Sequence, residues 1–85
     1  MVPFLSMKVL FFAHSRQLAG VDHYLLKVDR PITQAQFWAL LVEAFPPVVS
    51  QEKTARLARN EAYLRGSELL HPGDEIALIP PVSGG

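Results

Sequence analysis

One segment of the chain carries the signals for both ends of an α-helix. Thr33 is a strong helix N-cap, and Gln36 follows three residues later, which makes a capping box. Ile32 before the cap and Phe37 within the first turns form a matching hydrophobic staple. Apolar residues then recur at helical spacing, at Phe37, Leu40, Leu41, Ala44 and Phe45. The helix ends at Pro46-Pro47, because neither proline can donate a backbone hydrogen bond.

Short runs rich in β-branched and aromatic residues lie on both sides of this helix. Residues 7–13 and 21–28 precede it, and the polar connection between them at residues 14–20 predicts an antiparallel hairpin. After the helix we expect a turn or one helical turn at residues 48–54, strands at 55–59, 63–64 and 75–79, and turns at Asn60-Glu61 and His71-Pro72-Gly73-Asp74. This order predicts an α+β fold, a mixed sheet of about four to five strands with one main helix across one face.

Strand alternation assigns side chains to the two faces of the sheet. Lys8 does not suit a helix-covered core, so Val9 and Phe11 should face the helix. By the same reasoning Ile76 and Leu78 belong to the core. The open face then carries Leu10, Phe12, Ala77 and Ile79, with Tyr63 beside them.

Apolar side chains on a face that no helix covers predict a partner-binding surface, to which we assign Phe12, Tyr63 and Ile79. The alternative is that these three residues belong to the core, which would follow if the strand register were shifted by one residue.

Composition excludes several classes of protein. The 85 residues make one domain, and eight basic residues balance eight acidic ones, so neither nucleic acid nor an anionic membrane is an expected partner. Apolar runs such as residues 9–13 are too short to span a bilayer, and the first residues lack the basic region of a signal peptide. We therefore expect a cytoplasmic protein.

The side chains also argue against catalysis by a metal or a thiol. The chain contains no cysteine, which excludes disulfides, thiolate zinc sites and thiol nucleophiles. His14, His23 and His71 lack metal-ligand spacing, and we interpret all three as surface or structural residues. Four basic residues lie in the region before the chain end: Lys53, Arg56, Arg59 and Arg65. A solvated surface accounts for them, and docking to an acidic patch of a partner is the alternative.

The last residues, Pro80-Pro81-Val82-Ser83-Gly84-Gly85, cannot continue a central strand, because prolines lack the N–H group. They should leave the domain as an extended tail. We divide the chain into an N-terminal extension at residues 1–6, with Met7 as an alternative start, a domain at residues 7–79 and the tail at residues 80–85.

Four strings along the chain resemble those of a known family, the small subunits of molybdopterin synthase. They are Lys8-Val9-Leu10-Phe11-Phe12-Ala13, Leu18-Ala19-Gly20, Gly73-Asp74-Glu75 and the terminal Pro80-Pro81-Val82-Ser83-Gly84-Gly85. The resemblance covers residues 7–85, and the terminal string is its most specific part.

This resemblance implies the β-grasp fold of ubiquitin, which agrees with the order of elements. It also implies that an ATP-dependent activating enzyme adenylates Gly85, which is then converted to a thiocarboxylate. The tail would enter the active site of the large synthase subunit, in a heterotetramer, and donate sulfur to a pterin precursor. The chain alone would then be a co-substrate without turnover, and it would bind no cofactor, since the activating enzyme uses the ATP.

The tail suits this chemistry. A carboxylate is a poor electrophile, and adenylation gives it a leaving group, so that a sulfur donor can attack the carbonyl. Gly84 and Gly85 have no Cβ and can thread a narrow channel, while Pro80-Pro81 limits the entropy lost on insertion. We therefore predict a reactive end at Gly84 and Gly85 and partner contacts at Pro80, Pro81, Val82 and Ser83.

Three alternatives remain open. The thiamine sulfur carrier shares the β-grasp fold and the Gly-Gly end, but it is usually shorter, and the strings at residues 8–13 and 80–83 fit it less well. A ubiquitin-like modifier would use the same activated glycine to form isopeptide bonds with lysines. An inert interaction domain would require the tail to have no function.

Overall fold

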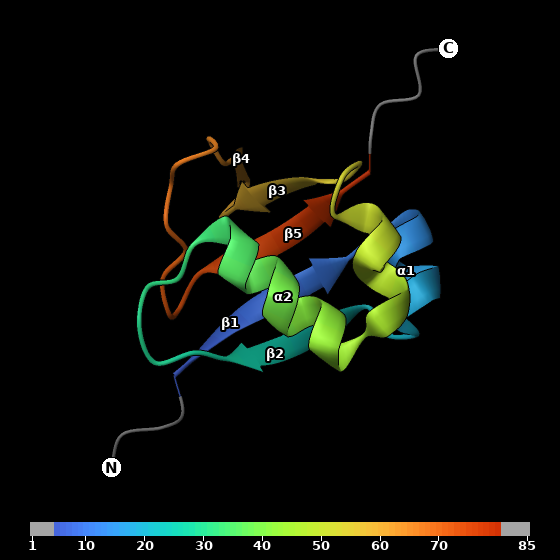
Figure 1. Ribbon diagram of the computed structural model, residues 1–85, viewed down its shortest axis with the longest axis horizontal. Helices are drawn as coiled ribbons and strands as arrows, with labels where there is room; N and C mark the ends of the chain where they lie inside the picture. The colour runs from blue at the N-terminus through green and yellow to red at the C-terminus, as the bar shows by residue number, and fades with distance from the viewer. Residues whose placement is uncertain (1–4, 81–85) are drawn as a thin grey trace.

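The computed structural model describes residues 5–80, which form one mixed sheet with a helix across it. Its elements are β1 (Ser6–Phe11), α1 (Ala13–Ala19), β2 (His23–Lys27), α2 (Gln34–Ala44), the 3₁₀ helix η1 (Pro46–Gln51), β3 (Arg56–Arg59), β4 (Ala62–Tyr63) and β5 (Glu75–Ile79). Figure 1 shows α2 crossing the sheet and α1 lying at the end toward which β1 points. The predicted α+β fold is confirmed.

The five strands are ordered β2-β1-β5-β3-β4. The central pair, β1 and β5, is parallel, and the other neighbouring pairs are antiparallel, including the predicted pairing of β1 with β2. The strand ladder begins at Ser6, and Leu5 already accepts a hydrogen bond from Val28 N–H at 3.1 Å. The predicted division at residues 1–6, 7–79 and 80–85 stays a prediction.

Helix α2 begins as its sequence predicts. The Thr33 hydroxyl accepts from Gln36 N–H at 3.0 Å, and the Gln36 side chain accepts from Thr33 N–H at 2.9 Å. These bonds satisfy two of the donors that a helix N-terminus leaves without partners. Pro46 and Pro47, which end α2, then form the first turn of η1, where a missing N–H costs nothing.

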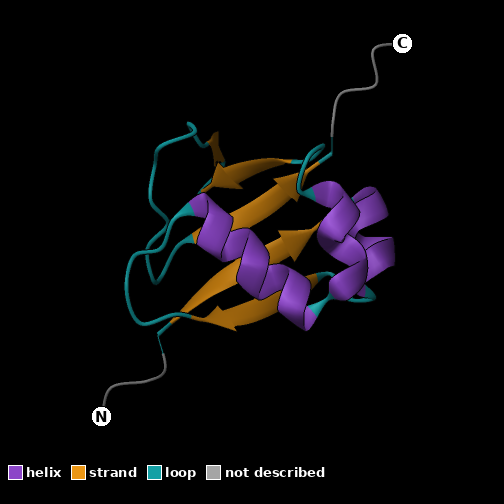
Figure 2. Ribbon diagram, viewed as in Figure 1, coloured by secondary structure: helices purple, strands orange, loops and turns teal. Residues whose placement is uncertain are grey.

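The predicted assignment of faces is also confirmed. Helix α2 covers one face of the sheet (Figure 2), and the buried side chains of the core lie between the two. The core contains Met7, Val9, Phe11, Leu26, Val28, Ile32, Phe37, Trp38, Leu41, Val48, Leu57, Leu70, Ile76 and Leu78. Lys8 and Phe12 are exposed on the other side of the sheet, and Leu10 is partly exposed there. The register shift that would have placed Phe12 in the core is therefore excluded.

The expected polar connection at residues 14–20 is wrong, because the structure has α1 there. The helix has only seven residues, and its N-cap, Phe12, offers no side-chain acceptor, so it lacks the sequence signals that mark α2. It ends at Gly20, whose φ of 80° is left-handed and whose N–H bonds Arg16 O at 2.8 Å. Ser15 is the buried residue of α1, and its hydroxyl donates to Gln51 Oε1 at 2.9 Å. This hydrogen bond connects α1 to η1.

Candidate functional site

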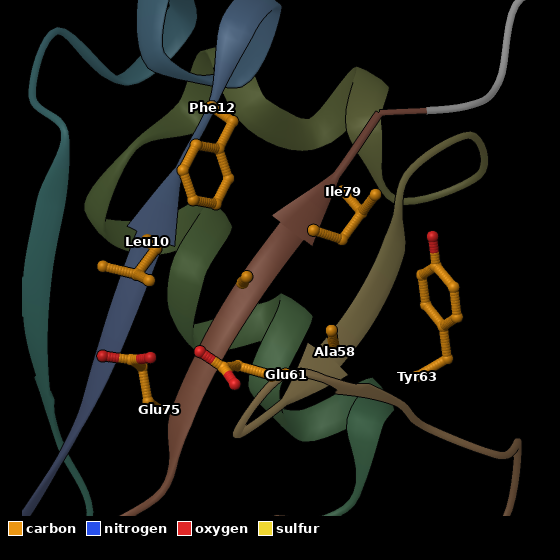
Figure 3. Close-up of a pocket in the computed structure, with 8 residues that line it drawn as sticks. Leu10, Phe12, Ala58, Glu61, Tyr63, Glu75 and Ile79 are labelled. Atoms are coloured by element: carbon orange, nitrogen blue, oxygen red, sulfur yellow. The ribbon is translucent and has the colours of Figure 1, made fainter.

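The face of the sheet opposite α2 holds a groove of about 350 Å³. It is lined by Leu10, Phe12, Ala58, Glu61, Tyr63, Glu75, Ala77 and Ile79 (Figure 3). The structure thus brings together three residues that the sequence assigns to partner binding, Phe12, Tyr63 and Ile79. They come from three separate parts of the chain: the end of β1, β4 and the end of β5.

The groove exists because small side chains alternate with large ones across neighbouring strands. Ala58 of β3 and Ala77 of β5 are directly paired and form its floor. Phe12 and Tyr63 stand at its edges, and 45% and 52% of their surfaces are exposed. Two aromatic side chains left this open to water around an apolar floor are typical of a protein-binding surface.

The groove borders the point where the chain leaves the domain. In the parallel pairing of β1 with β5, Phe11 pairs with Leu78, so the next residues, Phe12 and Ile79, lie at the same end of the sheet. Strand β5 ends at Ile79, and Pro80 follows without an N–H group to extend the ladder. A partner seated in the groove would therefore lie next to the root of the tail.

Helix α1 holds Phe12 in place. The Phe12 carbonyl accepts a hydrogen bond from Ser15 N–H at 3.0 Å, as the N-cap of α1. Ala13 follows with a φ of 50°, a left-handed conformation that turns the chain out of β1. The backbone of Phe12 is thus fixed although its side chain is exposed.

Charged groups lie at both ends of the groove. At the tail end, the guanidinium of Arg56 stacks on the ring of Tyr63, with Cζ 4.0 Å from the ring centroid. At the other end lie the carboxylates of Glu61 and Glu75 (Figure 3). Glu61 is placed there by a two-residue turn in which Asn60 and Glu61 both have positive φ, and Asn60 Oδ1 accepts from Glu75 N–H at 3.0 Å.

The other basic residue of β3, Arg59, has an internal role instead of the solvated one that the sequence suggests. Its guanidinium donates to Glu68 Oε1 at 2.5 Å and to Leu69 O at 2.8 Å, and its Nη1 lies 3.8 Å from Asp74 Oδ2. Glu68 also accepts from Arg65 N–H at 2.7 Å. That backbone hydrogen bond, with the nearby Arg59 charge, lowers the pKa of Glu68.

Sequence reasoning missed part of this site. Ala58, Glu61 and the stack of Arg56 on Tyr63 follow from the pairing of β3 with β4 and β5, which no local sequence pattern reveals. The open-face positions of Leu10, Ala77 and Ile79 are as predicted from strand alternation. Pro80 lies at the end of β5, and the other predicted tail residues, Pro81, Val82, Ser83, Gly84 and Gly85, lie outside the described residues.

Two further properties hold for residues 5–80. No three histidine, aspartate or glutamate side chains gather there in a way that could hold a metal ion. No helix in this part of the chain has the length and hydrophobicity needed to cross a membrane. The cytoplasmic location stays a prediction.

The mixed sheet, the helix across it and the apolar groove beside the last strand define a ubiquitin-like protein of the β-grasp fold. SAMP1 from Haloferax volcanii has this fold, with a TM-score of 0.80 and 32% identity over 94% of this chain and 99% of that chain. At the level of fold alone, a chain in the complex of subunits 1 and 2 of molybdopterin-converting factor from Helicobacter pylori matches with a TM-score of 0.66 and 21% identity, over 95% of this chain and 100% of that chain.

Sequence comparison gives the family. The sequence model of the ThiS family matches residues 9–85. The molybdopterin synthase sulfur carrier subunit of Chlamydomonas reinhardtii is 39% identical, over 95% of this chain and all of the relative. The chain belongs to the ThiS family and, within it, to the family of molybdopterin synthase sulfur carrier subunits. This confirms the resemblance seen in the sequence.

Proposed function

We propose that this chain is the sulfur carrier of molybdopterin synthase, with its C-terminal carboxylate as the carrier group. The observation that carries the proposal is the match over nearly the whole chain to relatives named as sulfur carrier subunits. The groove beside the root of the tail supports it, because a carrier must dock on the protein that receives its cargo. In this proposal the chain binds no cofactor of its own.

The chemistry proceeds at Gly85. An activating enzyme joins the carboxylate to the AMP portion of ATP and releases pyrophosphate. A sulfur donor then attacks the activated carbonyl, and AMP leaves with the electrons of the broken bond. The product is a thiocarboxylate, whose sulfur attacks an electrophilic carbon of the pterin precursor and displaces an oxygen leaving group from it. Water then hydrolyses the resulting thioester, which leaves the sulfur on the precursor and releases the carboxylate for another cycle.

The partner in the last step is proposed to be the large subunit of molybdopterin synthase. The Helicobacter pylori structure contains two different subunits of molybdopterin-converting factor, and one of them shares this fold. Docking through the groove would leave the residues after Pro80 to reach into the large subunit. The protein body then contributes position, which can supply much of the rate of a reaction between two bound groups.

Mass spectrometry tests the proposal. The chain is co-expressed with its activating enzyme and then added to the large subunit and the pterin precursor. We expect a mass gain equal to the exchange of one oxygen for one sulfur, and its loss as the dithiolene forms. A variant lacking Gly85 should neither gain this mass nor support dithiolene formation. Normal dithiolene formation by that variant would overturn the proposal, and sulfur transfer to a thiamine precursor instead would assign the chain to the other pathway.

A second candidate function has one observation in its favour. SAMP1, small archaeal modifier protein 1, is 32% identical to this chain and shares its fold. If the chain were a protein modifier, its activated Gly85 would form isopeptide bonds with lysines, and cell lysates would contain higher-mass conjugates that disappear when Gly85 is deleted. The sulfur carrier proposal expects the thiocarboxylate without such conjugates.

A further inference from the structure

We propose that Arg56, held against the ring of Tyr63, orients the docked chain by pairing with an acidic side chain that the large subunit presents beside the entry of the tail. This inference rests on the proposed function, since it concerns the same partner. It makes Arg56 a positioning residue, because the reacting atoms lie at Gly85.

The position of Arg56 follows from the strand register. Arg56 is the first residue of β3 and pairs with Ile79, the last residue of β5. It therefore stands at the end of the groove where the chain leaves the sheet. The apolar side chains of Phe12 and Ile79 lie at this end (Figure 3). The pairing of Arg56 with Ile79 brings a positive charge beside them.

The stack on Tyr63 fixes the guanidinium before any partner arrives. Tyr63 pairs with Ala58, two positions along β3 from Arg56, so the Tyr63 ring reaches Arg56 diagonally across the strands. An exposed arginine normally loses much side-chain freedom when it forms an ion pair. Here the ring restricts the side chain already in the free protein, so less entropy is lost on binding.

The charge of Arg56 also has no acidic partner among the described residues. Arg59, on the same strand, is engaged by Glu68 and lies near Asp74, whereas Arg56 forms no ion pair with any residue of the range 5–80. A fixed and uncompensated positive charge at the rim of an apolar groove is complementary to an acidic group.

The far end of the groove has the opposite sign. Glu61 and Glu75 lie there, and neither forms an ion pair with a described residue. Lys8 is paired with Glu75 in the register of β1 and β5, so two carboxylates stand against one ammonium at this end. The two ends of the groove therefore carry charges of opposite sign, so a charged partner can tell one end from the other. A partner with an acidic group at the tail end fits in one orientation, and the reversed orientation would place that group against Glu61 and Glu75.

Equilibrium binding to the large synthase subunit, measured at several salt concentrations, tests this role. We expect Arg56→Gln to weaken binding about fivefold at low salt and to reduce the salt dependence of Kd, since a rim ion pair is screened by ions. Arg56→Glu should weaken binding further, and Arg56→Lys should keep the salt dependence because it keeps the charge. Arg30→Gln is the matched control, since it removes the same charge from a loop beyond the opposite edge strand.

Two variants of Tyr63 test whether its ring holds the guanidinium of Arg56 in place. Tyr63→Phe keeps the ring, so in this background Arg56→Gln should cost as much affinity as it does in the wild-type chain. In a Tyr63→Ala background, Arg56→Gln should cost less than it does in the wild-type chain, because the guanidinium is no longer held in place. Thermal unfolding of each variant checks that the domain is folded.

The outcomes separate the two claims. If the wild-type chain does not bind the large subunit, the proposed function fails. If the wild type binds and Arg56→Gln binds equally well with the same salt dependence, the proposed function stands and the role of Arg56 is wrong.

Discussion

The depth of the groove depends on single residues, and above all on the paired alanines of its floor. Replacing Ala77 with Leu should fill the groove and weaken binding to the large subunit by about tenfold or more, since the anchor side chains of a partner would lose their pocket. The added side chain points away from the core, so the free energy of unfolding should change little. Calorimetric titration measures the affinity. Leu25→Ala, an exposed residue outside the groove, should bind normally, and a normal Kd for Ala77→Leu would contradict the assignment.

Glu68 should make stability depend on pH on the acid side. Its pKa is lowered in the folded chain, first by the hydrogen bond from Arg65 N–H and then by Arg59. The contribution of the ionised carboxylate is therefore complete above the unfolded pKa, about 4.3, and is lost as the pH falls through the folded pKa. The difference in unfolding free energy between the wild type and Glu68→Gln should be constant near neutral pH and shrink in acid. Urea titrations across this range measure it, and a difference independent of pH would contradict the prediction.

The two helices show what a sequence reveals about its elements. Helix α2 could be predicted because its ends depend on neighbouring residues, the capping box of Thr33 and Gln36 and the two prolines that follow. Helix α1 could not, because a contact distant in sequence, from Ser15 to Gln51, anchors it. The residue after it, Gly20, was its one local signal.

The bond between α1 and η1 should be measurable in stability. Ser15→Ala leaves the buried oxygen of Gln51 without its donor, and we expect a loss of about 1–3 kcal/mol in the free energy of unfolding. Urea unfolding of the variant measures the loss. Gln17→Ala, on the exposed side of the same helix, should change stability by no more than about 0.5 kcal/mol. Equal effects of the two substitutions would show that the buried bond does not hold α1.

At the scale of the whole molecule, the sequence predicts that two residues lie together only where strand alternation alone assigns both to one face of the sheet. It placed Phe12 and Ile79 on one face, since each belongs to a strand with a clear pattern. It could not place Arg56 beside Tyr63, because that contact depends on the order of the strands in the sheet. The opposite charge at the two ends of the groove is thus a property of the assembled sheet, while the chemistry proposed for Gly85 is a property of the chain end.

This separation of body and tail leads to a last prediction. A synthetic peptide of residues 80–85 that ends in a thiocarboxylate carries the reactive group without the groove. At micromolar concentration it should transfer sulfur to the pterin precursor at least about a hundredfold more slowly than the full thiocarboxylated chain, because docking raises the effective concentration of the tail at the active site. Millimolar peptide should recover part of the rate, and the thiocarboxylated Ala77→Leu chain should fall between the two. Single-turnover assays with the large subunit measure these rates, and equal rates for peptide and chain at micromolar concentration would mean that the folded body does not position the tail.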